Sequence, residues 1–464
     1  MKDLLFTFIT IFEIMIFTIS LYYVILSLCG LYRKKGGNTS NIRPKKRFAL
    51  VVAAHNEEAV IAQILDSMKS LDYPKRLYDV FVIADNCTDK TAKIAKKHKA
   101  LVYERFDDEN RGKGFALEWM FTRIFAMDNK YDAIAIFDAD NLISKNFLLE
   151  MNAQLLQGYK VVQGYIDSKN PHDSWITGSY SIAFWSVNRL FQLSRYNLGL
   201  SCQIGGTGFC VDTNILRELG WGATCLTEDL EFSCKLILSG YKVGWCHDAV
   251  VYDEKPLTLK QSWRQRKRWM QGFTDVASRF FTKLLKKSFK DKDFIALDCA
   301  IYTIQPFILL ALVFSAILGF VLSVTHSGMS SSIINLLFAP IFIKVFSIFQ
   351  FLFTPLVMMI EKKLSKGLFI LFALYSLNVF IFNGLINNLD NIYEVSRYIL
   401  YLMIFLIPLF IADREKSFKI FIWYLLYGVY TLTWVPITIQ GIIHKNRKDW
   451  CHTKHTRQLT IDEM

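Results

Sequence analysis

Apolar residues are concentrated towards the two ends of the chain and alternate with polar residues in the part between them. They fill residues 4–31 and return from about 297 to 443, in runs long enough to cross the roughly 30 Å of a bilayer's hydrocarbon. Residues 45–290 instead show the mixed pattern of an ordinary soluble domain. The pattern therefore predicts a soluble unit held between membrane segments.

Short apolar runs alternate with amphipathic stretches through the first half of the soluble unit. We expect strands at 48–53, 80–84, 101–103 and 133–137, and helices at 57–69, 89–98 and 114–125. This alternation indicates a parallel sheet with helices on both faces. Ligands of such sheets bind beyond the carboxyl ends of the strands. Asp85, Asp138 and Asp140 fall there, directly after predicted strands.

Two further stretches, residues 174–195 and 257–288, are rich in aromatic residues, and the second is also strongly basic. Such helices are typical of the membrane interface, so we expect both to lie against the bilayer. The remaining apolar stretches are about 297–324, 333–360, 366–388, 395–412 and 417–443.

Two rules give different numbers of membrane crossings for this chain. An N-terminal anchor that begins outside the cell, followed by five crossings, would place the basic tail outside, whereas positive segments favour the inside. We therefore expect four or five spans, with 333–360, which contains Pro340 and Pro355, as the segment that is re-entrant or interfacial.

Positive charge is gathered beside the apolar segments. The chain has 54 Lys and Arg against 41 Asp and Glu, a formal net charge of +13, with basic runs at 33–35, 45–47, 283–290 and 445–457. Positive loops beside spans attract anionic head groups, so membrane lipids are the expected partner and nucleic acid is not. The nine cysteines show no CxxC spacing, which favours reduced thiols in a cytoplasm over disulfides or a zinc site.

These patterns divide the chain into five expected parts. They are an N-terminal transmembrane helix with its flank, a cytoplasmic α/β domain, an interfacial helix region, a C-terminal transmembrane bundle and a basic cytoplasmic tail, at 1–35, 45–256, 257–295, 296–444 and 445–464 respectively.

Three short motifs carry candidate chemistry. Asp138-Ala139-Asp140 follows a strand, where two carboxylates can hold a divalent cation through hard oxygen ligands. Thr227-Glu228-Asp229 precedes a helix, and Gln265-Arg266-Lys267-Arg268-Trp269 shows a QxxRW pattern on a helix. Each has a simpler interpretation by itself: a pair of acids at a strand end, a helix N-cap, and an interfacial Trp/Arg belt.

Taken together and in this order, the motifs resemble the processive family 2 glycosyltransferases, which include cellulose, chitin, hyaluronan and poly-N-acetylglucosamine synthases. The resemblance covers roughly residues 48–275. It implies an α/β GT-A nucleotide-sugar domain, with a Rossmann-like mixed sheet, joined to an α-helical transmembrane domain with interfacial helices. It also implies a UDP-sugar donor, a growing polysaccharide acceptor, Mg or Mn as cofactor, and a catalytic domain at the cytoplasmic face of the cell membrane.

The resemblance assigns a role to each matching position. It places Asp229 as general base with Glu228 beside it, and Asp138 and Asp140 at the metal. Residues expected to bind the nucleotide-sugar are His55, Glu57, Asp85, Lys113, Asp138, Gln265 and Arg268. Residues expected at the acceptor are Trp269, Gly206 and Thr207.

Two features depart from the family pattern. Several relatives carry a regulatory domain after the last span, but only a short tail follows Ile443 here, so control by such a domain is not expected. The usual gating sequence after the QxxRW helix is not evident either.

The donor preference is the least specific inference. We expect UDP-glucose and a β-glucan, cellulose-like or of mixed linkage. UDP-N-acetylglucosamine with a chitin-, hyaluronan- or poly-N-acetylglucosamine-type product is the alternative. Transfer of one sugar to a polyprenyl phosphate is a second, although such relatives usually lack QxxRW. A transporter with a cytoplasmic nucleotide-binding domain represents a different class, and accessory subunits stay unspecified.

Overall fold

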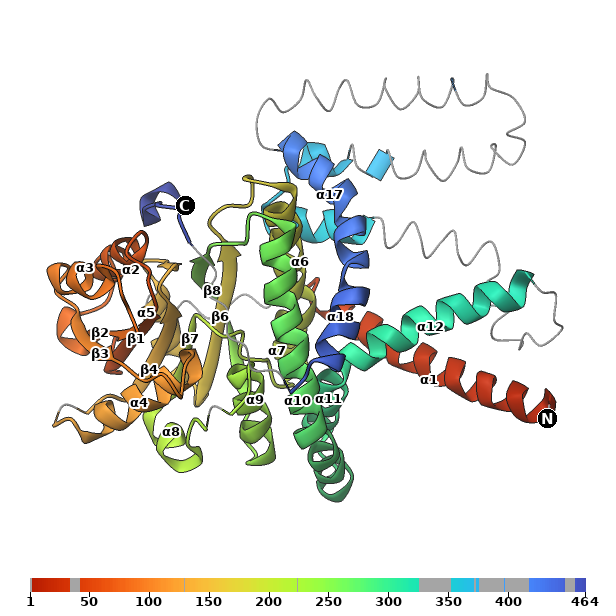
Figure 1. Ribbon diagram of the computed structural model, residues 1–464, viewed down its shortest axis with the longest axis horizontal. Coiled ribbons are helices and arrows are strands. Elements are labelled where there is room, and N and C mark those ends of the chain that lie inside the picture. The colour runs from red at the N-terminus through yellow and green to blue at the C-terminus, as the bar shows by residue number, and fades with distance from the viewer. Residues whose placement is uncertain are drawn as a thin grey trace.

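The computed structural model describes residues 2–33, 42–128, 130–222, 224–324, 352–370, 373–374, 396, 417–446 and 455–464. Its centre is an eight-stranded sheet in the order β3-β2-β1-β4-β7-β6-β8-β5 (Figure 1). The strands are β1 (Phe48–Ala54), β2 (Tyr78–Asp85), β3 (Leu101–Arg105), β4 (Ala133–Asp138), β5 (Leu142–Ile143), β6 (Val161–Ser168), β7 (Phe209–Asp212) and β8 (Val243–Asp253).

The sheet is mixed. Strands β3, β2, β1 and β4 run parallel, as the alternating pattern predicts, and each lies within two residues of its expected bounds. Strand β7 is antiparallel to both β4 and β6, and β8 is parallel to β6. The mixed sheet expected of a GT-A domain is therefore present.

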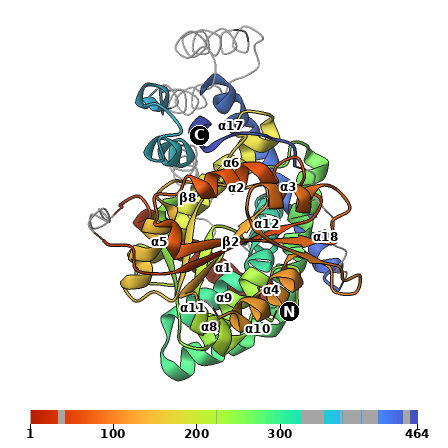
Figure 2. The ribbon, with the colours of Figure 1, turned by 90° about the vertical axis from the view of Figure 1, so that its left-hand side faces the viewer.

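Helices cover both faces of the parallel half. Helices α2 (Ile61–Lys69) and α5 (Phe147–Leu156) pack on the face that carries Phe48, Leu50 and Val52 of β1. Helix α4 (Lys113–Ala126) packs on the opposite face, which carries Ala49 and Val51. Figure 2 shows α2 and α3 (Thr91–Lys97) on one side of β2 and α4 on the other. The alternating side chains of buried strands thus build two cores.

The helix expected at 57–69 begins at Ile61 instead. Residues 57–60 form a turn, because Asn56 adopts a left-handed φ of 54° and the backbone N–H of Glu57 donates to Oγ1 of Thr91 at 2.8 Å. This turn leaves His55 and Glu57 beside the end of β1.

The stretch 174–195 lies in the interior and not at the surface expected for it. It forms α6 (Trp175–Val187), a π-helical segment (Asn188–Leu193) and the start of α7 (Ser194–Asn197). Trp185 is 2% exposed and its Nε1 donates to Asp167 of β6 at 2.7 Å. One face of α6 meets β6 and another meets α17 (Ser417–Leu432). Its aromatic residues therefore cover protein.

The basic stretch 257–288 is part of one long helix, α10 (Leu259–Asp291). Its first turn is closed by a capping box in which Thr258 accepts a hydrogen bond from the backbone of Gln261. Helix α10 packs against α9 (Glu228–Leu238), α11 (Phe294–Thr303) and α18 (Trp434–Ile443) (Figure 1). It therefore connects the soluble domain to the apolar helices.

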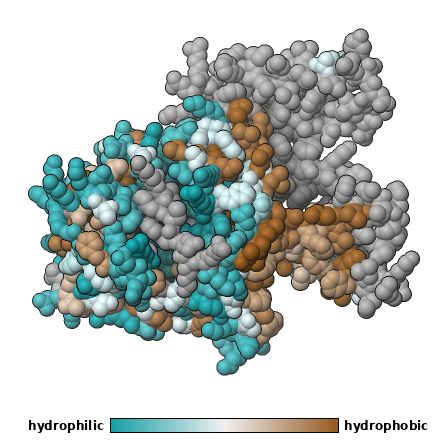
Figure 3. Space-filling view, in the orientation of Figure 1, coloured by the Kyte–Doolittle hydropathy of each residue, from teal (hydrophilic) through white to brown (hydrophobic). Residues whose placement is uncertain are grey.

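The described residues include two helices long and apolar enough to cross a membrane, at Thr7–Cys29 in α1 (Lys2–Cys29) and at Ile422–Ile443. The stretch expected as a span at 297–324 is broken: α11 and α12 (Gln305–Val324) meet at a bend of 66°. Figure 3 shows apolar surface over α1 and α12 beside a mainly hydrophilic soluble part. The expected spans at 333–360, 366–388 and 395–412 lie largely outside the described residues.

A buried ion pair joins the N-terminal helix to the rest of the protein. Arg195 of α7 donates from Nε and Nη2 to the two carboxylate oxygens of Asp298 in α11, both at 2.8 Å. The hydroxyl of Tyr22 in α1 donates to the same carboxylate at 2.6 Å. Because both charged groups are almost fully buried, removal of one would leave the other without a counter-charge.

We predict that Arg195→Met lowers the stability of the folded protein by about 3–5 kcal/mol, the usual effect of breaking a buried pair. The double variant Arg195→Met/Asp298→Leu should recover most of this loss, since it removes both charges. Thermal unfolding in detergent measures the effect, with Arg76→Met, at an exposed position, as the control. Equal unfolding temperatures for the wild type and Arg195→Met would contradict the assignment.

Candidate active site

A cavity of about 830 Å³ lies beyond the carboxyl ends of β1, β2 and β4. All thirteen residues that the motifs and the resemblance single out line this one cavity. They come from strand ends, from the starts of α4 and α9 and from α10, and are far apart in the sequence. The structure thus brings together Asp140 and Asp229, on which the proposed chemistry depends.

One end of the cavity is formed by the loops after β1 and β2. His55 contacts the backbone carbonyl of Asp85 through Nδ1 at 2.7 Å. The Asp85 carboxylate accepts a hydrogen bond from Nη1 of Arg105 at 2.6 Å. Burial raises the pKa of Asp85 although this guanidinium opposes the shift. Arg105 therefore holds Asp85 in a fixed position at the cavity wall.

The C-terminal segment enters the same end of the cavity. Nδ1 of His455 lies 2.8 Å from Oε1 of Glu57, and the ring lines the cavity. The backbone N–H groups of Thr456 and Arg457 donate to Glu254 at 3.0 and 2.9 Å. Figure 1 shows this segment over the edge where α2 and β8 lie. The segment expected as a basic tail at 445–464 is thus docked on the domain over residues 455–464.

His455 is surrounded by acids. Burial opposes the charged form of its ring, but Asp140, Glu57 and Glu254 outweigh burial and raise the pKa of His455 to about 10. The ring is therefore protonated at neutral pH and balances part of this negative charge.

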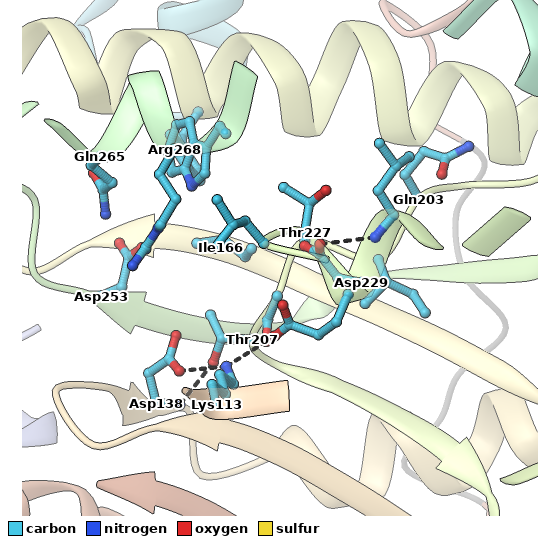
Figure 4. Close-up of a pocket in the computed structure, with 18 of the residues that line it drawn as sticks. Lys113, Asp138, Ile166, Gln203, Thr207, Thr227, Asp229, Asp253, Gln265 and Arg268 are labelled. Atoms are coloured by element: carbon cyan, nitrogen blue, oxygen red, sulfur yellow. Dashed lines mark hydrogen bonds and ion pairs between the residues drawn. The ribbon is translucent and has the colours of Figure 1, made fainter. Parts of the chain in front are cut away.

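Asp138 and Asp140 stand at the end of β4. Asp138 forms an ion pair with Nζ of Lys113 from the first turn of α4 (Figure 4). Asp140 is 5% exposed and accepts a hydrogen bond from the backbone N–H of Glu254 at 2.8 Å. Burial opposes its charge, yet His455, Lys169 and this N–H together lower the pKa of Asp140. The surroundings of Asp140 therefore favour its ionised form.

The two carboxylates fit a cation that shares its ligands with a nucleotide. Mg²⁺ commonly binds through one or two carboxylates together with substrate phosphates, and not in a cage made only of protein groups. Over the described ranges, no three His, Cys, Asp or Glu side chains are arranged as a complete metal site. Asp138 and Asp140 supply the oxygen ligands that such a shared site needs.

The loop 205–208 forms the floor between these carboxylates and α9. Its carbonyl at Gly206 accepts a hydrogen bond from Nζ of Lys113 at 2.7 Å, and Gly206 has a φ of 83°. A Cβ there would lie 3.3 Å from Oδ2 of Asp229. The hydroxyl of Thr207 is engaged within the protein: it forms a hydrogen bond with Asn141 and accepts one from the backbone N–H of Asp138. Glycine thus keeps the space in front of Asp229 open.

Glu228 and Asp229 begin α9 and face the cavity. Burial, with the adjacent charge of Asp229, raises the pKa of Glu228 to about 7. Burial also raises the pKa of Asp229, while the backbone N–H of Leu230, which donates at 2.8 Å, and the charge of Lys113 oppose the rise. A carboxylate whose pKa lies nearer to neutrality is a more effective proton acceptor.

Helix α10 forms the opposite wall. Gln265 accepts a hydrogen bond from the hydroxyl of Tyr180 at 2.8 Å. Figure 4 shows Arg268 reaching from α10 towards Asp253, at the end of β8. Trp269 stacks on Trp434 of α18, with ring centroids 6.4 Å apart and an interplanar angle of 21°. This wall therefore presents a cation and a broad aromatic surface to the cavity.

Four acidic or basic residues of the cavity were not among the predictions: Arg111, Asp253, Glu254 and His455. Asp253 and Glu254 come directly after β8, so the strand-end rule that selects Asp85 would also have selected them. Burial raises the pKa of Asp253 to about 6, and Lys255 donates to its carboxylate at 2.9 Å. No sequence signal pointed to His455.

Residues 44–272 match the profile of a family described as "Glycosyltransferase like family 2". The matched range holds the whole sheet and the three motifs. This part of the chain is therefore similar to the family 2 glycosyltransferases, and the comparisons support a glycosyltransferase enzyme.

Three curated relatives match over a similar length. "Probable glycosyltransferase YdaM" of Bacillus subtilis is 28% identical over 255 residues, 53% of this chain and 60% of its own. A beta-monoglucosyldiacylglycerol synthase of Nostoc sp. is 33% identical over 233 residues, 48% of each chain. A poly-beta-1,6-N-acetyl-D-glucosamine synthase of Staphylococcus epidermidis is 27% identical over 242 residues, 51% of this chain and 57% of its own. The chain thus spans about half to three fifths of the length of these relatives.

A solved structure shares the fold. It is the mannosyltransferase PcManGT from Pyrobaculum calidifontis, in complex with GDP-Man and Mn²⁺, with a TM-score of 0.51 and 18% identity. The likeness covers 72% of this chain and 90% of that one. It supports the GT-A-like mixed sheet. By their names, the curated relatives include both a polymer synthase and a glycolipid synthase, so the processive type stays a prediction.

We predict that Glu228→Gln shifts the acid limb of the pH–activity profile to lower pH. The ionised form of Glu228 places a negative charge beside Asp229 and makes Asp229 a stronger proton acceptor, and this charge is lost as the pH is lowered through about 7, the pKa of Glu228. Wild-type activity should therefore fall in this range, whereas the variant carries no charge at position 228 at any pH and should lose activity only when Asp229 itself is protonated. The rate of UDP release across pH 5–9 measures this, with Glu104→Gln as an exposed control. An unmoved acid limb would show that the two acids are not coupled.

We predict that His455→Ala loosens the docked tail. The change removes a charged hydrogen bond to Glu57, of about 1.5–3 kcal/mol, so amide exchange at Thr456 and Arg457 should rise about ten- to a hundredfold. Hydrogen exchange read by mass spectrometry measures the effect, and His98→Ala, at the edge of α3, serves as the control. Unchanged exchange in the tail would mean that His455 does not hold it.

Proposed function

We propose that the protein transfers glucose from UDP-glucose to the non-reducing end of a growing β-glucan, cellulose-like or of mixed linkage. One observation carries the proposal: a single cavity contains acids at the nucleotide end, two carboxylates suited to a cation, a carboxylate of raised pKa and an aromatic surface. These are the parts that an inverting sugar transfer requires, in the order in which donor and acceptor would use them.

The donor would lie across the ends of β1, β2 and β4. His55 and Asp85 stand where the uracil base would bind, with Glu57 beside them, and Lys113 and Arg268 supply positive charge for the diphosphate. Asp138 and Asp140 would hold Mg²⁺ or Mn²⁺, which supplies charge neutralisation for the diphosphate when bound. Gln265 lines the same cavity and would bind the donor there.

Asp229 would act as the general base. It accepts the proton of an acceptor hydroxyl while that oxygen bonds to the anomeric carbon and the bond from this carbon to the UDP oxygen breaks. The electron pair leaves with UDP, so the leaving group needs no proton. Direct displacement inverts the anomeric centre and gives a β-linked product from an α-linked donor. The open space above Gly206 gives the acceptor access to Asp229.

The acceptor sugar would lie on Trp269. Aromatic faces suit pyranose rings, whose axial C–H groups are apolar, and Tyr180, Phe184 and Trp434 extend the aromatic surface around Trp269. Gly206 and Thr207 border the same space. UDP-N-acetylglucosamine is the alternative donor, since a polymer synthase that this name describes is among the relatives.

A second candidate function is transfer of one sugar to the hydroxyl of a membrane lipid. One observation favours it: Phe273, Tyr302, Pro306 and Leu309, from α10 and the bent pair α11–α12, line the far end of the cavity. This apolar end lies among helices long and apolar enough for a bilayer. A relative named beta-monoglucosyldiacylglycerol synthase fits this candidate.

The enzyme would work at the cytoplasmic face of the cell membrane. The two apolar helices and the exposed apolar residues of α1 and α12 support membrane attachment. The proposed organisation keeps the GT-A domain at 45–256, the helix region at 257–295, the membrane bundle at 296–444 and the tail at 445–464, with product secretion through the bundle.

The experiment incubates the purified protein in detergent with Mg²⁺ or Mn²⁺ and with each radiolabelled UDP-sugar. We expect polymer from UDP-glucose that β-glucanases digest, and Asp229→Asn should lower it at least about a hundredfold with UDP binding retained. The control is Asp72→Asn, at an exposed position.

The outcomes separate the candidates. Label from UDP-glucose that extracts into organic solvent would favour the lipid acceptor, and polymer from UDP-N-acetylglucosamine alone would favour the other donor. Ion flux without UDP release would indicate a transporter. Loss of UDP binding in Asp229→Asn, in parallel with activity, would contradict the role of general base.

A further inference from the structure

Arg266 lies within the QxxRW segment, but its side chain does not line the cavity. It is fully buried, and none of its three guanidinium nitrogens has a hydrogen-bond partner among the described residues. A buried charge without a counter-charge is costly, so the guanidinium of Arg266 must be stabilised by some other interaction. Neither the donor site nor the general base accounts for this residue.

Two aromatic rings surround the guanidinium. Its central carbon lies 4.3 Å from the ring centroid of Tyr430 and 4.9 Å from that of Trp434. Both distances fall within the range of cation–π attraction, which is strongest when the cation is removed from water. The cation is thus held by the faces of two rings in place of an anion.

The two rings belong to different helices that meet at a break. Helix α17 ends at Leu432 and α18 begins at Trp434. Pro436 has no N–H to donate to the carbonyl of Leu432, which interrupts the helical hydrogen bonds there. Tyr430 stands before the break and Trp434 after it, so Arg266 contacts both sides of it.

Both rings also reach the cavity. Trp434 stacks on Trp269, and Tyr430 meets Tyr180 edge-on with centroids 5.6 Å apart. Tyr430 and Trp434 themselves line the cavity. A change in the position of either ring would therefore move the aromatic surface on which Trp269 lies.

We propose that Arg266 is a positioning residue: its buried guanidinium, held between Tyr430 and Trp434, orients the aromatic surface around Trp269 for the acceptor. The inference rests on the proposed function in one respect, that the acceptor lies on Trp269. Lysine is an incomplete substitute, because a compact ammonium cannot lie flat against two ring faces as a planar guanidinium does. A neutral side chain leaves the rings and the helix break without this contact.

The experiment compares Arg266→Met and Arg266→Lys with Arg264→Met, an exposed position two residues away on the same helix. Three quantities are measured for each: the Kd for UDP, the slow hydrolysis of UDP-sugar without acceptor, and the rate of transfer to acceptor with its KM. In Arg266→Met we expect UDP affinity and hydrolysis within about twofold of wild type. Transfer should fall about ten- to a hundredfold, as a small misplacement of a reactant causes.

Arg266→Lys should fall between wild type and Arg266→Met, and Arg264→Met should match the wild type. Wild-type transfer in Arg266→Met would overturn the proposal. So would a parallel loss of UDP affinity, hydrolysis and thermal stability, because that pattern indicates a residue needed only for folding. If Arg266→Met does not fold, Tyr430→Leu, which removes one ring and keeps the cation, replaces it with the same expected split between hydrolysis and transfer.

Failure of the proposed function gives a different result. If the wild type releases UDP from no donor, the transferase assignment itself fails. If the wild type transfers sugar to a lipid and not to a glucan, the variants are compared with that lipid as acceptor. The role of Arg266 is then supported if hydrolysis of the UDP-sugar is retained while transfer to the lipid falls, and it is overturned if transfer is unchanged.

Discussion

Most of the carboxylates around the cavity are balanced by a cation or by backbone N–H groups, and this pairing fixes their positions. An isolated buried charge is costly, so an ionised acid needs a partner at a defined place. Arg105 is paired with Asp85, Lys255 with Asp253, and His455 with Glu57. Arg105 belongs to β3, Lys255 follows β8 and His455 lies in the tail, so these pairs bring three separate parts of the chain together at the cavity.

Helix α10 connects the cavity to the apolar helices, because it lines the first and packs on the second. One of its faces carries Arg268 and Trp269 to the cavity, and another packs closely on α18, where a Cβ on Gly441 would meet Met270 at 2.4 Å. At its other end it packs with α9 and α11. In the proposed function, the helix that would contact the donor is thus also the helix that packs on α18, which would hold the active site at a fixed distance from the membrane.

Much of the parallel half of the fold could be predicted from the sequence, because buried strands are continuous apolar runs and acids at their ends stand out. The direction of β7 could not, since a strand of four residues, three of them apolar, carries no sign of parallel or antiparallel pairing. Aromatic residues in α6 look the same whether they meet lipid or protein, which explains why this helix was expected at the interface. The role of His455 could not be predicted, because its contact with Glu57 joins positions 398 residues apart and no local pattern encodes such a pairing.

The docked tail has a consequence for how the protein matures. His455 follows the helix at Ile422–Ile443 in the chain, whereas the acids that it balances belong to elements hundreds of residues earlier. In the proposed function these acids line the donor pocket, so the pocket would have its full set of balancing charges only after the tail has docked on the folded sheet.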